Sequence, residues 1–182
     1  MPAPFGRFDG VSLAMGAAAL TAWTFIPDHK LTGVLLLIAA SLHLLRLARW
    51  AGDRTLRDPL VLILHTGYLF VPLGLLLAGF SALFNDRSQD VAAIHVLGVG
   101  AMGTMTLAVM TRATLGHTGH ALRADTWTCL IYTLIIIAAL TRLSATFWPA
   151  NIFLLHTAAI LWSLAFLGFC LRYSGMLFQR YP

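Results

Sequence analysis

The chain has 182 residues, of which 59% are hydrophobic and only 10% are charged, and its mean hydropathy is +0.81. Soluble domains average about 25% charged residues, so this composition excludes a water-soluble globule, a disordered chain and a nucleic-acid-binding domain. The net charge of +5 fits a lipid bilayer as the partner, because the basic residues lie in short segments between long apolar runs.

Six segments are long and apolar enough to cross a membrane, which takes about 20 mostly apolar residues. They are residues 11–26, 31–50, 60–84, 91–113, 126–147 and 152–173. Pro27, Pro59 and Pro149 fall between segments, where a helix has to restart in any case. We therefore predict an all-α polytopic membrane protein, a bundle of six transmembrane helices that forms one domain over residues 1–182.

The basic residues also predict an orientation, because cytoplasmic loops carry an excess of Lys and Arg. With a cytoplasmic N-terminus, the inner side holds nine basic residues and the outer side holds three. The nine are Arg7, Arg46, Arg49, Arg54, Arg57, Arg112, Arg123, Arg172 and Arg180, and the three are Lys30, Arg87 and Arg142. We expect both termini in the cytoplasm.

Seven histidines are unusual in so apolar a chain. His43 and His65 lie on consecutive predicted helices, roughly 10 Å and 8 Å from the inner ends of those helices. Imidazole is a common haem and copper ligand, so we expect this pair to face each other across one cavity as the axial ligands of a haem. The alternative for each histidine is a neutral, hydrogen-bonded packing residue.

The fourth segment contributes further candidates. His95 lies near its outer end and is a candidate ligand of a second metal site. Arg112 is a candidate partner for a haem propionate, since Arg binds carboxylates bidentately; interfacial anchoring is the alternative. His117 falls in the stretch LGHTGH, residues 115–120, where we expect an ordered, cytoplasmic loop.

Gly98, Gly100 and Gly103 match the pattern GxGxxG but lie in the middle of the apolar fourth segment, with no preceding strand. Dinucleotide binding needs a strand before this pattern and a helix after it. We instead expect these glycines to permit close helix packing or to leave room for a flat macrocycle.

Residues 93–119 read AIHVLGVGAMGTMTLAVMTRATLGHTG, and this run resembles the signature of the NnrS family. Residues 42–50 (LHLLRLARW) and 59–74 (PLVLILHTGYLFVPLG) resemble that family too. The resemblance covers nearly the whole chain and corresponds to the C-terminal six-helix half of the family.

The resemblance implies an inner-membrane protein that binds haem, expected to be b-type, and copper, and that takes part in nitric oxide and nitrite metabolism or resistance to nitrosative stress. The matching histidines are His43, His65, His95 and His117. No reaction is assigned. A cytochrome b-like electron-transfer subunit and a small transporter remain the alternatives. Because only half of the family's length is represented, we expect a homodimer or a separately encoded partner that supplies the other half.

Overall fold

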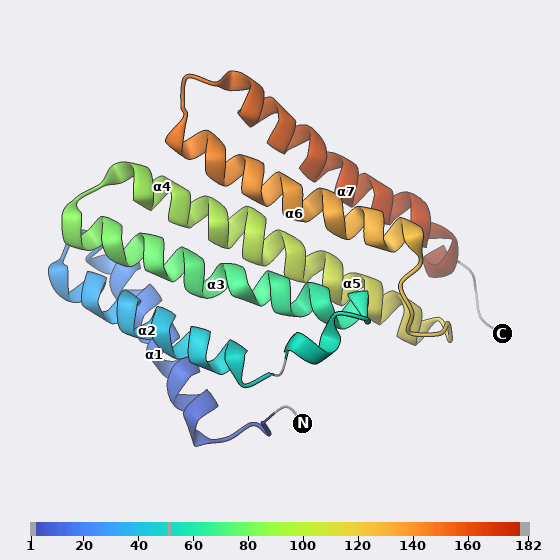
Figure 1. Cartoon of the computed structure of the whole chain (residues 1–182), viewed down its shortest axis with the longest axis horizontal. Coiled ribbons are helices and arrows are strands. Elements are labelled where there is room, and N and C mark those ends of the chain that lie inside the picture. Colours follow the sequence, from blue (N-terminus) through green and yellow to red (C-terminus); the bar gives the residue numbers. More distant parts are fainter. Residues whose placement is uncertain (1–2, 51, 179–182) are drawn as a thin grey trace.

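The computed structural model describes residues 3–50 and 52–178 (Figure 1). Arg180 lies outside the described residues. Every regular element within them is helical, which confirms the all-α prediction. The elements are α1 (Arg7–Phe25), α2 (Lys30–Ala48), η1 (Gly52–Thr55), α3 (Pro59–Phe84), α4 (Arg87–His95), η2 (Val96–Gly103), α5 (Thr104–His117), α6 (Thr126–Phe147) and α7 (Ile152–Phe178).

Five helices are long and apolar enough to cross a membrane. They are α2, α3, the continuous helix Arg87–His117 that contains α4, η2 and α5, then α6 and α7. Helix α1 is not among them, because Arg7 and Asp9 in its first turn, together with its glycine, serine and threonine residues, lower its mean hydropathy. The structure thus supports five of the six expected spans by length and composition.

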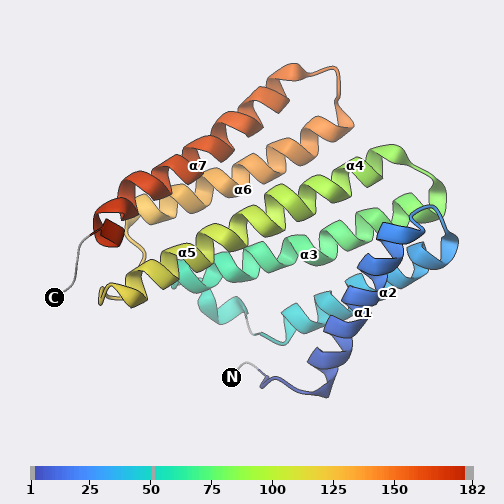
Figure 2. The same cartoon turned by 180° about the vertical axis from the view of Figure 1, so that it is seen from behind.

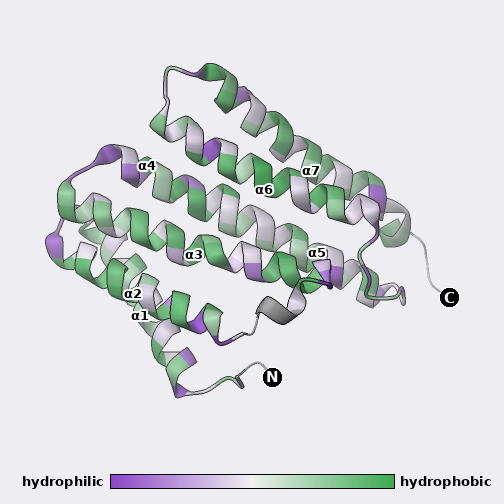
Figure 3. Cartoon of the chain, in the orientation of Figure 1, coloured by the Kyte–Doolittle hydropathy of each residue, from purple (hydrophilic) through white to green (hydrophobic). Residues whose placement is uncertain are grey.

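With Arg87–His117 counted as one helix, each long helix runs antiparallel to the next, so both termini lie at one end of the bundle (Figures 1 and 2). We call this the termini end and the other the far end. Helix α3 is central and packs against α2, α4, η2 and α5, while α6 and α7 form a hairpin that continues the bundle beyond η2 and α5. Hydrophobic residues cover most of the helix surfaces, and hydrophilic ones gather mainly at the helix ends (Figure 3).

The fourth predicted segment is one helix with a π-helical stretch, η2, at its middle. The glycines of η2 differ in how closely neighbouring helices pack against them. A Cβ on Gly100 would lie 2.7 Å from the Phe70 ring of α3, whereas Gly98 has no neighbour within 4 Å. The expected close packing is therefore confirmed at Gly100. The pattern lies wholly inside a helix, which is not the setting of a phosphate-binding loop.

His117 is the last residue of α5 and not part of a loop as expected. The helix continues through His117, since the Thr118 N–H still donates to the Thr114 carbonyl at 3.0 Å. The chain then turns at Gly119, which has φ 69°. The His120 N–H then donates to the Leu115 carbonyl at 2.9 Å. Hydrogen bonds thus define the turn, and its side of the membrane stays a prediction.

Candidate functional site

His43 is buried between α1, α2 and α3 near the termini end. Its Nδ1 lies 2.5 Å from the Tyr68 hydroxyl, and Arg46 donates from Nη1 to that same hydroxyl at 2.7 Å. Because the Tyr68 hydroxyl accepts from Arg46, its own O–H donates to His43 Nδ1. The opposite edge of the imidazole packs so closely against Gly16 that a Cβ there would lie 2.6 Å from Nε2. Both ring nitrogens of His43 thus face packed protein.

Arg46 connects this pair to an acidic residue of α1. Its Nε donates to Asp9 Oδ1 at 3.1 Å, and its guanidinium lies 5.0 Å from the centroid of the Trp50 ring. The Gly6 N–H donates to Asp9 Oδ2 at 3.0 Å. The Asp9 carboxylate thus accepts from both the Gly6 backbone and the Arg46 guanidinium. The cluster therefore carries a carboxylate next to a guanidinium.

His65 on α3 has a different environment. Its Nδ1 donates to the Val61 carbonyl at 3.0 Å, which places the proton on Nδ1 and leaves a lone pair on Nε2. That Nε2 is buried and has no hydrogen-bond partner in the described part of the chain. His65 lines an open groove of about 370 Å³, together with Leu47, Ala48, Gly52, Leu62, Thr66 and Leu69.

The two histidines belong to one chain of aromatic rings. The Tyr68 ring lies 5.8 Å from His43 and 4.5 Å from Trp50, and Trp50 meets His65 edge-on at 5.7 Å. The imidazoles come to the same end of the bundle, as the spacing predicts. Their nitrogens nevertheless have separate surroundings, because His43 is bonded inside the helix packing while His65 Nε2 is unpaired beside the groove.

His95 lies on α4, directly before the π-helical stretch. Arg142 of α6 donates from Nη2 to His95 Nε2. This contact uses the lone pair that a metal ion would need and puts a positive charge beside it. The described residues contain no group of three or more His, Cys, Asp or Glu side chains that could hold a metal ion.

Arg112 and His117 come together at the termini end of α5. Both side chains are exposed and line a groove of about 470 Å³ with Leu64, Val109, Ala113, Gly116 and Leu122. This groove opens at the surface of the bundle, and neither side chain has a hydrogen bond within the described residues. Either an interfacial anchor or a contact to a carboxylate fits this placement.

Sequence reasoning missed Tyr68 and Asp9 as partners of the histidine cluster, and it treated Arg142 only as an outer flanking charge. A signal for Arg142 was present, because a charge five residues inside an apolar segment is a functional-site hypothesis by default. Tyr68 and Asp9 gave no such signal, since their role depends on helices that pack together only in the fold.

The chain was also compared with known proteins. The family model described as "NnrS protein" matches residues 1–180. No curated protein and no solved structure matches the chain.

Proposed function

This chain belongs to the NnrS family, and we propose on that premise that it is a haem-binding membrane protein that acts in nitric oxide metabolism or resistance to nitrosative stress. Family membership and five apolar helices make it a nitric-oxide-related, multi-pass membrane protein. Haem as the cofactor, the inner membrane as the location and cytoplasmic termini are parts of the proposal.

The buried, unpaired Nε2 of His65 is the observation that carries the haem proposal. A metal-ligating histidine usually donates its other ring N–H to a carbonyl or carboxylate, which fixes the tautomer. His65 has this arrangement, since Nδ1 donates to Val61. A buried polar atom without a partner costs about 1–3 kcal/mol, and a bond from Nε2 to the metal of a cofactor would offset that cost.

His65 would hold the haem through Nε2 at the groove beside α2 and α3. Ala48, Gly52 and Thr66 are the small residues in the lining of that groove, and the Trp50 ring packs against the imidazole with ring centroids 5.7 Å apart. His43 does not fit as the second ligand, because both of its nitrogens face packed protein. A haem bound there would supply an iron centre to which nitric oxide could bind.

We propose no copper site, because His95 Nε2 accepts from a guanidinium and the described residues hold no larger cluster of ligands. The electron-transfer alternative differs in one measurable way. An electron-transfer subunit would be reduced by a quinol, whereas the proposed role requires the haem-loaded protein to bind nitric oxide.

The absorption spectrum of purified, haem-reconstituted protein tests the proposal. Wild type should bind one haem, and His65→Gly should lose it and regain it when imidazole is added. His156→Gly is the matched control, because His156 is exposed on α7 and should leave the spectrum unchanged. Full haem binding by His65→Gly without imidazole would overturn the assignment.

We also propose that α1 is a sixth membrane crossing, although its composition alone does not qualify it. At the termini end the Ala3 N–H donates to the Arg49 carbonyl at 3.1 Å, which places the start of α1 beside the end of α2. At the far end the Thr32 hydroxyl donates to the Ile26 carbonyl at 2.8 Å. Helix α1 therefore runs along the length of α2.

A homodimer, or a complex with a separately encoded partner, remains part of the proposal. Helix α7 supports it, because only 17% of its most apolar window is buried inside the chain. Mass measurement in detergent tests this point, and a monomer of 19.8 kDa that binds haem would contradict it.

A further inference from the structure

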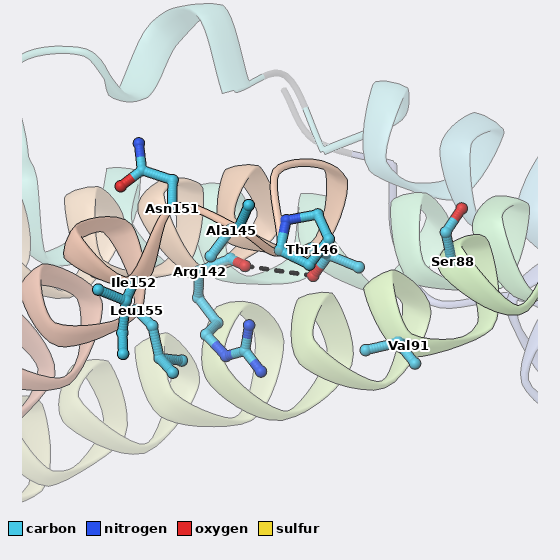
Figure 4. Close-up of a pocket in the computed structure, with 10 residues that line it drawn as sticks. Ser88, Val91, Arg142, Ala145, Thr146, Asn151, Ile152 and Leu155 are labelled. Atoms are coloured by element: carbon cyan, nitrogen blue, oxygen red, sulfur yellow. Dashed lines mark hydrogen bonds between the residues drawn. The ribbon is translucent and has the colours of Figure 1, made fainter.

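Arg142 lies within the apolar helix α6 and reaches between α4 and α7 at the far end of the bundle (Figure 4). Its side chain is half-buried. A guanidinium has five N–H donors, and within the described residues the side chain makes one hydrogen bond, to His95 Nε2. Most of its hydrogen-bonding capacity is therefore directed into the surrounding space.

No acidic side chain of the described residues forms an ion pair with Arg142. The acids on the adjacent stretch of α4 have other partners. Asp86 accepts from Ser88 and Gln89, and Asp90 accepts from the Trp23 indole of α1 at 3.2 Å. A guanidinium inside an apolar segment is costly without a counter-charge, so an anion bound beside Arg142 would stabilise it.

Two adjacent cavities share Arg142 and Leu155 in their linings. The larger, of about 520 Å³, includes Ser88, Thr146 and Asn151. The smaller, of about 270 Å³, includes His95, Trp162 and Ser163. Helix α7 begins at Ile152, which also lines the larger cavity, so the positive end of that helix dipole adds to the charge of Arg142.

We infer that the cavity around Arg142 is a binding site for an oxyanion. The planar guanidinium fork matches the paired oxygens of a carboxylate, nitrite or phosphate, and Ile152 at the start of α7 lies in the same lining. His95 acts as a positioning residue, since its Nε2 holds one arm of the guanidinium. The site lies at the opposite end of the bundle from His65, so it does not depend on haem.

An oxyanion at this depth has two sources, a free small anion or the phosphate of a phospholipid headgroup. Thermal unfolding of the delipidated, full-length protein in detergent separates them. The probes are sodium formate, sodium nitrite, inorganic phosphate and phosphatidylglycerol, each compared with sodium chloride at equal ionic strength. We expect an upward shift of the unfolding midpoint, because a ligand that binds only the folded state stabilises it. A shift with the small anions identifies a free ligand, and a shift with phosphatidylglycerol alone identifies the lipid phosphate.

Three variants carry the test. Arg142→Gln should abolish the shift, and Arg142→Lys should reduce the affinity about tenfold because the charge stays but the bidentate fork is lost. Arg87→Gln is the matched control, since it removes an exposed arginine at the same end and should keep the full shift. If Arg142→Gln does not fold, Arg142→Lys alone decides. An unchanged affinity in Arg142→Lys, or no shift beyond chloride in wild type, overturns the inference.

Discussion

Arg46 of α2 donates from Nε to Asp9 Oδ1 of α1 at 3.1 Å, and both side chains are largely shielded from solvent. Because the same guanidinium donates to the Tyr68 hydroxyl, one arginine connects α1, α2 and α3. Helix α1 is the least apolar of the long helices, so this polar contact adds to the apolar packing that holds α1 against α2 and α3.

Asp9→Asn should loosen α1, because it leaves the Arg46 guanidinium without its carboxylate. We expect faster amide hydrogen exchange throughout α1 and little change in α6 and α7. Asp28→Asn makes the same change at an exposed position in the turn after α1 and should leave exchange as in wild type. Unchanged protection of α1 in Asp9→Asn would show that apolar contacts with α2 suffice.

Asp125 predicts an acid-dependent loss of stability. It caps α6 at the Thr128 N–H and pairs with Arg172 of α7. Partial burial opposes its ionisation, but the hydrogen bonds from Thr128 and Arg172 outweigh burial and lower the pKa from 3.8 to about 2. A lowered folded-state pKa gives stability that is present above pH 3.8 and is lost as the pH falls through about 2.

The variants Asp125→Asn and Asp125→Ala separate the two roles of this residue. Asparagine still caps a helix but carries no charge, so it should flatten the pH dependence of the unfolding midpoint between pH 4 and pH 2. Alanine should in addition lower stability by about 0.5–2 kcal/mol at neutral pH through loss of the cap. Equal acid dependence in wild type and Asp125→Asn would assign the pH effect to another group.

Gly79→Ala should destabilise the contact between α2 and α3. A Cβ on Gly79 would lie 2.8 Å from the Leu37 side chain and 3.2 Å from the Gly33 carbonyl oxygen, and a Cβ on Gly33 would meet the Gly79 carbonyl oxygen at 3.0 Å. Overpacking of this kind costs about 1–3 kcal/mol. Gly175→Ala, with nothing within 4 Å of its Cβ, should be neutral or slightly stabilising. The midpoint of unfolding in detergent measures both.

Cysteine labelling tests the orientation and the crossing by α1. In a variant whose Cys129 and Cys170 are replaced by serine, single cysteines are placed at the exposed positions Ala3, Asp28 and Ala121. An impermeant maleimide applied to intact cells should label only Asp28→Cys, since the other two positions lie at the termini end. Labelling of Ala3→Cys from outside would reverse the orientation, and equal accessibility of Ala3→Cys and Asp28→Cys would exclude a crossing by α1.

The sequence by itself determined the fold class, the positions of the helices and the family. Long apolar runs have to form helices in a membrane, because every backbone polar group needs a partner there, and the breaks at Pro27, Pro59 and Pro149 separate those runs. The predicted segment 126–147 has the same bounds as α6. The start of the segment expected at 91–113 was placed four residues late, because the capped first turn of α4 is polar.

Only the tertiary structure decided which nitrogen each histidine leaves unpaired. Depth along a helix follows from residue spacing, so His43 and His65 were expected at the same end of the bundle. The direction of each ring depends on rotation of the helices and on neighbours far away in the chain, such as Gly16 beside His43 and Arg142 beside His95. Within the described chain, His43 and His95 therefore have hydrogen-bond partners inside the bundle, whereas His65 Nε2 has none. Only the packing of separate helices fixes these partners, so the sequence alone could not predict them.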